Sequence, residues 1–150
     1  MSATPVLLAH HKHCDDLFAG AEAAAYAGHW AACRDAFQRF SGEMTAHFAT
    51  EEEVLFPAFE TATGNTGGPT SMMRLEHAQM NALMMQAAQA AVVADSEGFS
   101  GAVETLLILM QQHNMKEENI LYPMCDRVLS ANDLALEREL ATRTAGTCPP

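Results

Sequence analysis

The sequence predicts an all-α protein, an up-down-up-down four-helix bundle. Apolar residues recur at i, i+3, i+4 and i+7 through four long segments, which is the period of one face of a helix. Strand-like alternation of apolar and polar residues is absent from the sequence. A histidine motif that begins at residue 47 recurs at residue 113, which indicates that the chain contains two copies of a two-helix unit. Four such helices joined by short connections pack as a bundle.

The first two helices should form one antiparallel pair. Thr4-Pro5 predicts the start of the first helix, because proline is favoured at the first helical position. This helix should run to about Tyr26 and end near Gly28. The second helix should begin around Trp30 and weaken at Pro57, whose ring removes a backbone N–H.

A second pair of helices should follow a glycine-rich connection. Residues 61–69 contain three glycines and are predicted as a loop. The third helix should restart at Pro69 and run to about Ala94. Residues 95–101 are predicted as another loop, and the fourth helix should run from there to about Pro123 or somewhat beyond. We expect its apolar stripe to continue to Ile120.

The C-terminal part should add little to this bundle. Asn132-Asp133 is a predicted cap for a short fifth helix that ends near Ala141. The length fits one domain. We therefore expect residues 1–145 to form a single metal-binding bundle and residues 146–150 to be a disordered tail.

Composition narrows the classes of function. The net charge of −11 argues against nucleic acid and anionic membrane surfaces as partners. No stretch approaches the roughly 20 apolar residues of a membrane span, and no secretory signal is visible, so we expect a cytoplasmic protein. The four cysteines form no Cys-x-x-Cys pair, and we expect reduced thiols with Cys14 as a core residue.

The repeated motif places metal-binding side chains inside apolar stripes. Each copy reads His-x-x-x-Glu-Glu-x-β-branched-Leu-aromatic-Pro, and two lone histidines share its offset. An unpaired buried carboxylate is strongly disfavoured, so a cation between these helices would stabilise them. A mixed imidazole and carboxylate set suits iron or manganese, and six ligands suit two ions. The predicted metal ligands are His11, His47, Glu51, His77, His113 and Glu117.

Neighbouring polar residues have alternative interpretations. His10 and His13 point about 100° and 200° away from the first lone histidine on a helical wheel, so we expect them to be exposed and not to bind metal. Glu52 and Glu118 either orient an imidazole or remain solvated charges. Tyr122 either approaches the site or packs in the core, and packing is favoured.

These motifs resemble the hemerythrin-like family, also called the HHE cation-binding domain. The resemblance covers about residues 5–130 and rests on the lone histidine, both His-x-x-x-Glu motifs with their Leu-aromatic-Pro continuation, and Glu76-His77. It implies a four-helix bundle around an oxo- or hydroxo-bridged centre of two non-haem iron ions. In that analogy Glu51 and Glu117 bridge the ions and the four histidines are terminal ligands.

Two positions depart from the pattern of the oxygen-carrying members of this family. Met73 stands where those proteins have a second histidine on the third helix. Glu117 follows His113 by four residues, where those proteins have an aspartate after five. The resemblance therefore implies an open position, a water or an unexpected ligand at one iron, and it favours redox reactivity over reversible oxygen carriage.

The function that the resemblance implies is the binding or sensing of oxygen, nitric oxide or peroxide, with zinc or manganese as substitute metals. We expect a binding or sensing protein rather than an enzyme, and a sensor would need a partner protein, since the sequence shows no output domain. The alternative is a di-iron oxidase or peroxidase, or an iron-donating repair protein for nitrosative or oxidative damage. A third hypothesis is iron storage or a structural bundle. Turnover of peroxide or oxygen would separate an enzyme from a binding protein.

Overall fold

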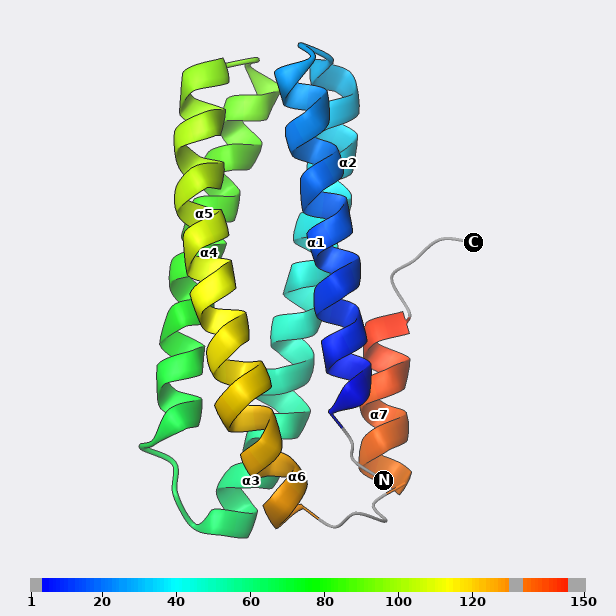
Figure 1. The fold of residues 1–150 in the computed structure, drawn as a ribbon, viewed down its shortest axis with the longest axis vertical. Helices are drawn as coiled ribbons and strands as arrows, with labels where there is room; N and C mark the ends of the chain where they lie inside the picture. The colour runs from blue at the N-terminus through cyan, green and yellow to red at the C-terminus, as the bar shows by residue number, and fades with distance from the viewer. Residues whose placement is uncertain (1–3, 130–133, 146–150) are drawn as a thin grey trace.

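Four long helices lie side by side in the computed structural model of the protein, which describes residues 4–129 and 134–145 (Figure 1). The described residues contain no strand, which confirms the predicted all-helical class. Within the same ranges no helix is both long and apolar enough to cross a membrane. The four long helices are α1 (Pro5–Tyr26), α2 (Trp30–Thr50), α4 (Pro69–Val92) and α5 (Ser96–Lys116).

The long helices pack mainly in two pairs, α1 with α2 and α4 with α5. Gly28 turns the chain after α1 with a φ of +77°, a left-handed conformation that favours glycine. The predicted loop at residues 95–101 is wrong, because α5 already begins at Ser96. The carboxylate of Asp95 accepts a hydrogen bond from the backbone N–H of Gly98 at 3.0 Å, and this cap allows the helix to start in a glycine-rich segment.

The predicted weakening of the second helix at Pro57 is wrong in place, because α2 ends at Thr50 and Pro57 lies within a further helix. The chain passes through a π-helical turn, η1 (Glu51–Leu55), and continues as α3 (Phe56–Thr63), which ends at the left-handed Gly64. Helix α5 does the same through η2 (Glu117–Leu121) and α6 (Tyr122–Val128). A proline clashes with the carbonyl four residues earlier, and a wider turn relieves that clash.

Each π turn also shifts which residues face inward. Ile120 is 56 % exposed, so its predicted place in the core is wrong. Leu121 takes that place and is fully buried, because the wide turn adds one residue before the inward face returns. Leu55 occupies the equivalent buried position at the end of η1.

A short C-terminal helix, α7 (Leu134–Ala145), packs against α1 and α2 (Figure 1). It runs four residues further than the predicted end at Ala141. The cap predicted at Asn132-Asp133 and the tail predicted at residues 146–150 lie outside the described residues.

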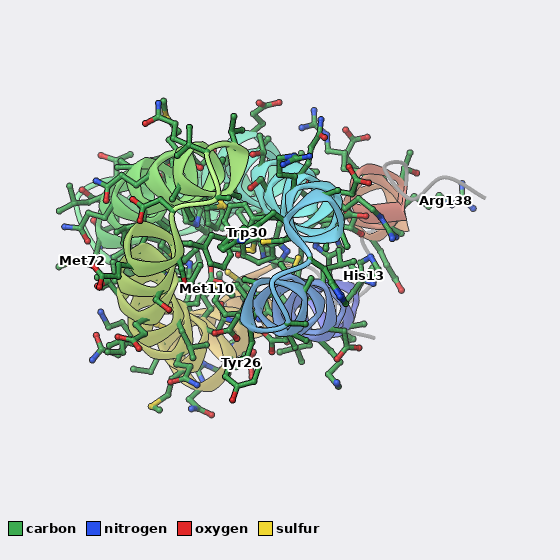
Figure 2. All side chains as sticks on the ribbon, turned by 90° about the horizontal axis from the view of Figure 1, so that it is seen from above. His13, Tyr26, Trp30, Met72, Met110 and Arg138 are labelled. Atoms are coloured by element: carbon green, nitrogen blue, oxygen red, sulfur yellow. The ribbon has the colours of Figure 1, made fainter. Side chains whose placement is uncertain are left out.

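The core consists of two apolar clusters. One lies along the paired long helices and includes Phe18, Phe40 and Leu106, and the other, near η1, η2 and α7, includes Leu55 and Leu121. Seen along the bundle, Met110 lies among the helices whereas Tyr26 points away from them (Figure 2). Apart from His47, which Phe48 of the first cluster follows directly, the predicted ligands lie in sequence between the segments that form these clusters, and so they make a polar layer between two apolar ones.

The cysteines agree with the prediction of reduced thiols. Cys14, Cys33 and Cys125 are buried and not in disulfides. Cys14 is part of the core, as expected. Burial raises the pKa of the Cys125 thiol to about 12. Cys148 lies outside the described residues.

Candidate metal centre

The six predicted ligands come together in the middle of the bundle, and all six are buried. They form two groups of four, in each of which one ligand atom per residue lies within 4.8 Å of the others. Group one contains His11 and His47, and group two contains His77 and His113. Glu51 and Glu117 belong to both groups, which is the arrangement that two carboxylate-bridged cations require.

Every histidine presents the same nitrogen to this centre. The Nε2 atom of His11 lies 3.2 Å from Glu117 Oε1, and that of His77 lies 3.1 Å from Glu51 Oε1. The Nε2 atoms of His47 and His113 lie 3.6 Å and 3.3 Å from the carboxylate four residues further along their own helices. The i, i+4 spacing produces this last arrangement, because such residues share a helix face.

The chemistry of the donor set fits a cation. Among the described residues, the buried side-chain atoms without a hydrogen-bond partner include four at this centre: Glu51 Oε1, Glu117 Oε2, His77 Nε2 and His113 Nε2. Leaving buried polar atoms unpaired costs about 1–3 kcal/mol each. Lone pairs of this kind are the ligands that iron, zinc and manganese take. A cation at the centre would therefore satisfy atoms that no protein group satisfies.

In three of the histidines the other ring nitrogen, Nδ1, contacts a carboxylate. The Nδ1 atom of His11 contacts Glu118 at 2.7 Å, and that of His77 contacts Glu52 at 2.6 Å. Because a carboxylate only accepts, Nδ1 donates the proton and Nε2 keeps its lone pair for a metal. Of the two interpretations of Glu52 and Glu118, the structure therefore favours orientation of an imidazole.

Glu76 does the same for His113, since its Oε1 atom lies 2.8 Å from His113 Nδ1. Sequence reasoning missed this role, although Glu76 precedes His77 in the family motif. The repeat offset could have indicated this role, because Glu76 lies 66 residues after His10. His10 contacts His47 in the first half of the chain, as Glu76 contacts His113 in the second.

His10 is buried at 6 % exposure, so the predicted solvent exposure of this residue is wrong. Its Nδ1 atom lies 2.9 Å from Nδ1 of His47, and its Nε2 atom lies 3.0 Å from Glu43 Oε2. The buried stripe of α1 spans more than 100° and includes two adjacent histidines, because α2 covers both. Burial, followed by the charge of His47, lowers the pKa of His10. Neither metal-binding group includes His10 or His13.

Tyr122 both packs in the core and reaches the ligands, so the prediction that favoured packing alone is incomplete. Its hydroxyl donates to Glu51 Oε2 at 2.6 Å and lies 3.3 Å and 3.4 Å from the Nε2 atoms of His47 and His11. Burial and the charges of both glutamates raise the pKa of Tyr122 well above its ordinary value. The phenol therefore keeps its proton at this position.

The two groups differ at the position of this tyrosine. Phe56 precedes Tyr122 by 66 residues and occupies the equivalent place in the first motif. Its ring packs nearly parallel to His77, with 19° between the planes and 5.8 Å between centroids. Group one thus faces a hydroxyl and group two faces an aromatic ring.

The titrating groups support positive charge at this centre. Burial acts to lower the pKa of His113, but the hydrogen bond and charge of Glu117 outweigh it and raise that pKa to about 9. Burial acts to raise the pKa of Glu51, but the neighbouring His47 and hydrogen bonds lower it well below its ordinary range. A buried Glu51 held in its ionised form among histidines is a charge pattern that a bound cation satisfies.

A helical bundle with four histidines and two glutamates in one buried layer defines a metal-binding class of protein. The family model described as the hemerythrin HHE cation binding domain matches residues 2–125, and the chain belongs to that family. Neither the curated proteins nor the solved structures gave a match to this chain.

Proposed function

We propose that the protein holds two non-haem iron ions and binds or senses a small molecule, such as oxygen, nitric oxide or peroxide. The observation that carries the proposal is that two four-residue groups share both glutamates. Glu51 and Glu117 would bridge the ions, with His11 and His47 completing one and His77 and His113 the other. Zinc or manganese could occupy the same ligands. The proposal includes the up-down-up-down order of the long helices, which the tight turns after α1 and α4 favour.

Bound iron would supply redox chemistry and affinity for small diatomic or peroxide ligands. The chain supplies the surroundings. The apolar clusters on both sides of the polar layer exclude bulk water. The Tyr122 hydroxyl holds a proton at Oη next to group one, and a small ligand there could accept this hydrogen bond in place of Glu51.

A surface groove supports approach from the side of group one. It lies between α1 and α5, and its volume is about 690 Å³. Phe18 and Met110 line it, and so does Glu118, whose carboxylate contacts His11. The side chain of Glu118 is 39 % exposed and contacts the buried imidazole of His11, so it links the groove to a ligand of group one.

Anaerobic iron loading followed by metal analysis and optical spectroscopy tests the proposal. We expect about two iron atoms per chain, and a change of spectrum when nitric oxide or oxygen is added. The matched control is the variant Glu51→Ala loaded in the same way. Tight binding of a single zinc with no iron uptake would refute the di-iron proposal.

An oxidase or peroxidase is the second candidate, and the buried phenol of Tyr122 at group one is the observation that favours it. Catalytic consumption of hydrogen peroxide by the iron-loaded protein would support the enzyme. Binding of one ligand per centre without turnover would support the binding or sensing protein, which would then act through a partner protein.

A further inference from the structure

We propose that His10 and Glu43 are positioning residues that fix the ring of His47 with its Nε2 atom toward group one. The proposal rests on the proposed function in one respect, namely that His47 is a metal ligand. His10 and Glu43 themselves touch no predicted bridging or reacting atom and act through His47.

Three buried side chains form a continuous chain of contacts. Glu43 is 3 % exposed, and its Oε2 atom lies 3.0 Å from His10 Nε2. The other ring nitrogen of His10 lies 2.9 Å from His47 Nδ1. The two rings are nearly parallel, with 6° between their planes, so the N–H of one ring can point along its plane to the lone pair of the other.

The direction of each hydrogen bond follows from the carboxylate. Glu43 can only accept, so His10 donates from Nε2. The Nδ1 atom of a neutral His10 then carries a lone pair and accepts a hydrogen bond from the Nδ1–H of His47. His47 is thereby left with a lone pair on Nε2, the atom that lies 3.6 Å from Glu51. The chain thus sets the tautomer of His47 as well as the orientation of its ring.

The same place in the second half of the protein is filled differently. Glu76, at the offset of His10, contacts His113 directly through a carboxylate. His47 instead contacts a neutral imidazole, which polarises its N–H less than a charged carboxylate does. His47 should therefore donate less electron density to a metal than His113, and the two metal positions should differ in affinity.

His13 provides a control on the outer side of the same cluster. Its Nε2 atom lies 3.4 Å from Glu43 Oε1, and its side chain is 37 % exposed. Figure 2 shows this residue near the outer edge of the bundle. Glu43 keeps its contact with His10 through the other oxygen, so removal of His13 should leave His47 as it is.

Long-range proton–nitrogen NMR spectra of the zinc-loaded, ¹⁵N-labelled protein test the proposal, since they report which ring nitrogen holds a proton and which binds metal. In the wild type we expect His47 to carry its proton on Nδ1 and metal on Nε2. The double variant His10→Phe/Glu43→Leu removes both positioning residues, and an apolar replacement of a buried pair can leave stability nearly unchanged. We expect it to shift the His47 signals and to weaken one zinc site about 10- to 100-fold, with the His113 signals unchanged.

Unlike the double variant, the single variant Glu43→Gln keeps an acceptor oxygen for His10. It should therefore show the wild-type tautomer of His47. His13→Ala should give the wild-type pattern. Unchanged His47 signals and zinc affinity in the double variant would overturn the proposal, as would loss of the tautomer in His13→Ala. Failure of the proposed function would be seen separately, as fewer than two zinc ions in the wild type.

Discussion

At the scale of single residues, the two buried glutamates decide whether the centre can exist. Both carboxylates are fully buried, and each offers one oxygen that no hydrogen bond satisfies. Removing one of them takes away a carboxylate that belongs to both four-residue groups, and so a bridge in the proposed centre. Glu51→Ala or Glu117→Ala should therefore reduce the metal content from about two ions per chain to one or none.

The matched control is Glu53→Ala. Glu53 lies on the same π turn, but its side chain is 60 % exposed and pairs with Arg143 on the surface. This variant should keep both ions when metal content is measured by elemental analysis. An unchanged metal content in both bridging variants would refute the assignment.

Tyr122→Phe tests the role of the phenol separately from its packing. The ring stays, but the hydroxyl that contacts Glu51 and both histidines of group one is lost. We expect both ions to remain, the optical spectrum of the iron-loaded protein to change, and the free energy of unfolding to fall by about 1 kcal/mol. The exposed Tyr26 gives the control Tyr26→Phe. An iron spectrum identical to the wild type would contradict this role.

At the residue scale, the sequence identified side chains that lie together where the signal was local. The i, i+4 spacing of His47 and Glu51, together with the repeat offset, was enough to choose residues that the structure brings together. The role of His10 could not be predicted in this way. That role depends on the contact of His10 with Glu43 on the neighbouring helix. Neither segment alone determines which face of α2 lies against α1.

At the scale of elements, the two π turns hold the glutamates proposed to bridge the ions. Each begins at such a glutamate, and a proline follows each turn by two residues. The sequence predicted that the second helix weakens at Pro57, because proline disrupts an α-helix. It did not predict that the helix continues through a wider turn. Helix starts at Pro5 and Pro69 and the turn at Gly28 were predictable, because each depends on the chemistry of one or two adjacent residues.

Two glycines provide a test of the helical hairpin. Gly20 lies exposed within α1 with open space at its Cβ position, so Gly20→Ala should stabilise the protein by about 0.5–1 kcal/mol. Gly28 has a φ of +77°, so Gly28→Ala should cost about 1–2 kcal/mol. Urea unfolding at a fixed metal content measures both. If the free energy of unfolding changed in the same direction in both variants, the assigned turn would be contradicted.

At the scale of the whole molecule, the layer of candidate metal ligands joins two apolar clusters that neither half of the chain completes alone. Buried ligands are best satisfied when cations are bound, so metal binding adds to folding stability. A metal ion present at about 100 times its dissociation constant adds about 2.7 kcal/mol to the free energy of unfolding. Chelation should therefore lower the melting temperature by about 5 °C or more for a chain of this size.

The variant Glu51→Ala is the control for this effect, since it has less metal to lose. Its melting temperature should respond less to the chelator than that of the wild type. An equal response would indicate that the chelator acts elsewhere in the molecule. The layered arrangement behind this prediction could be only partly predicted from the sequence. The apolar stripes indicate which helix faces point inward, but they do not indicate the π turns that place Leu55 and Leu121 in the core next to the candidate ligands.

Anomalous diffraction at the iron absorption edge, from crystals of the iron-loaded protein, tests the central claim most directly. Two peaks should appear between the four helices about 3.5–4 Å apart, the spacing of known two-metal sites. One peak should lie beside His11 and His47, the other beside His77 and His113, and both should lie beside Glu51 and Glu117. A single peak, or two peaks that share neither glutamate, would contradict the account.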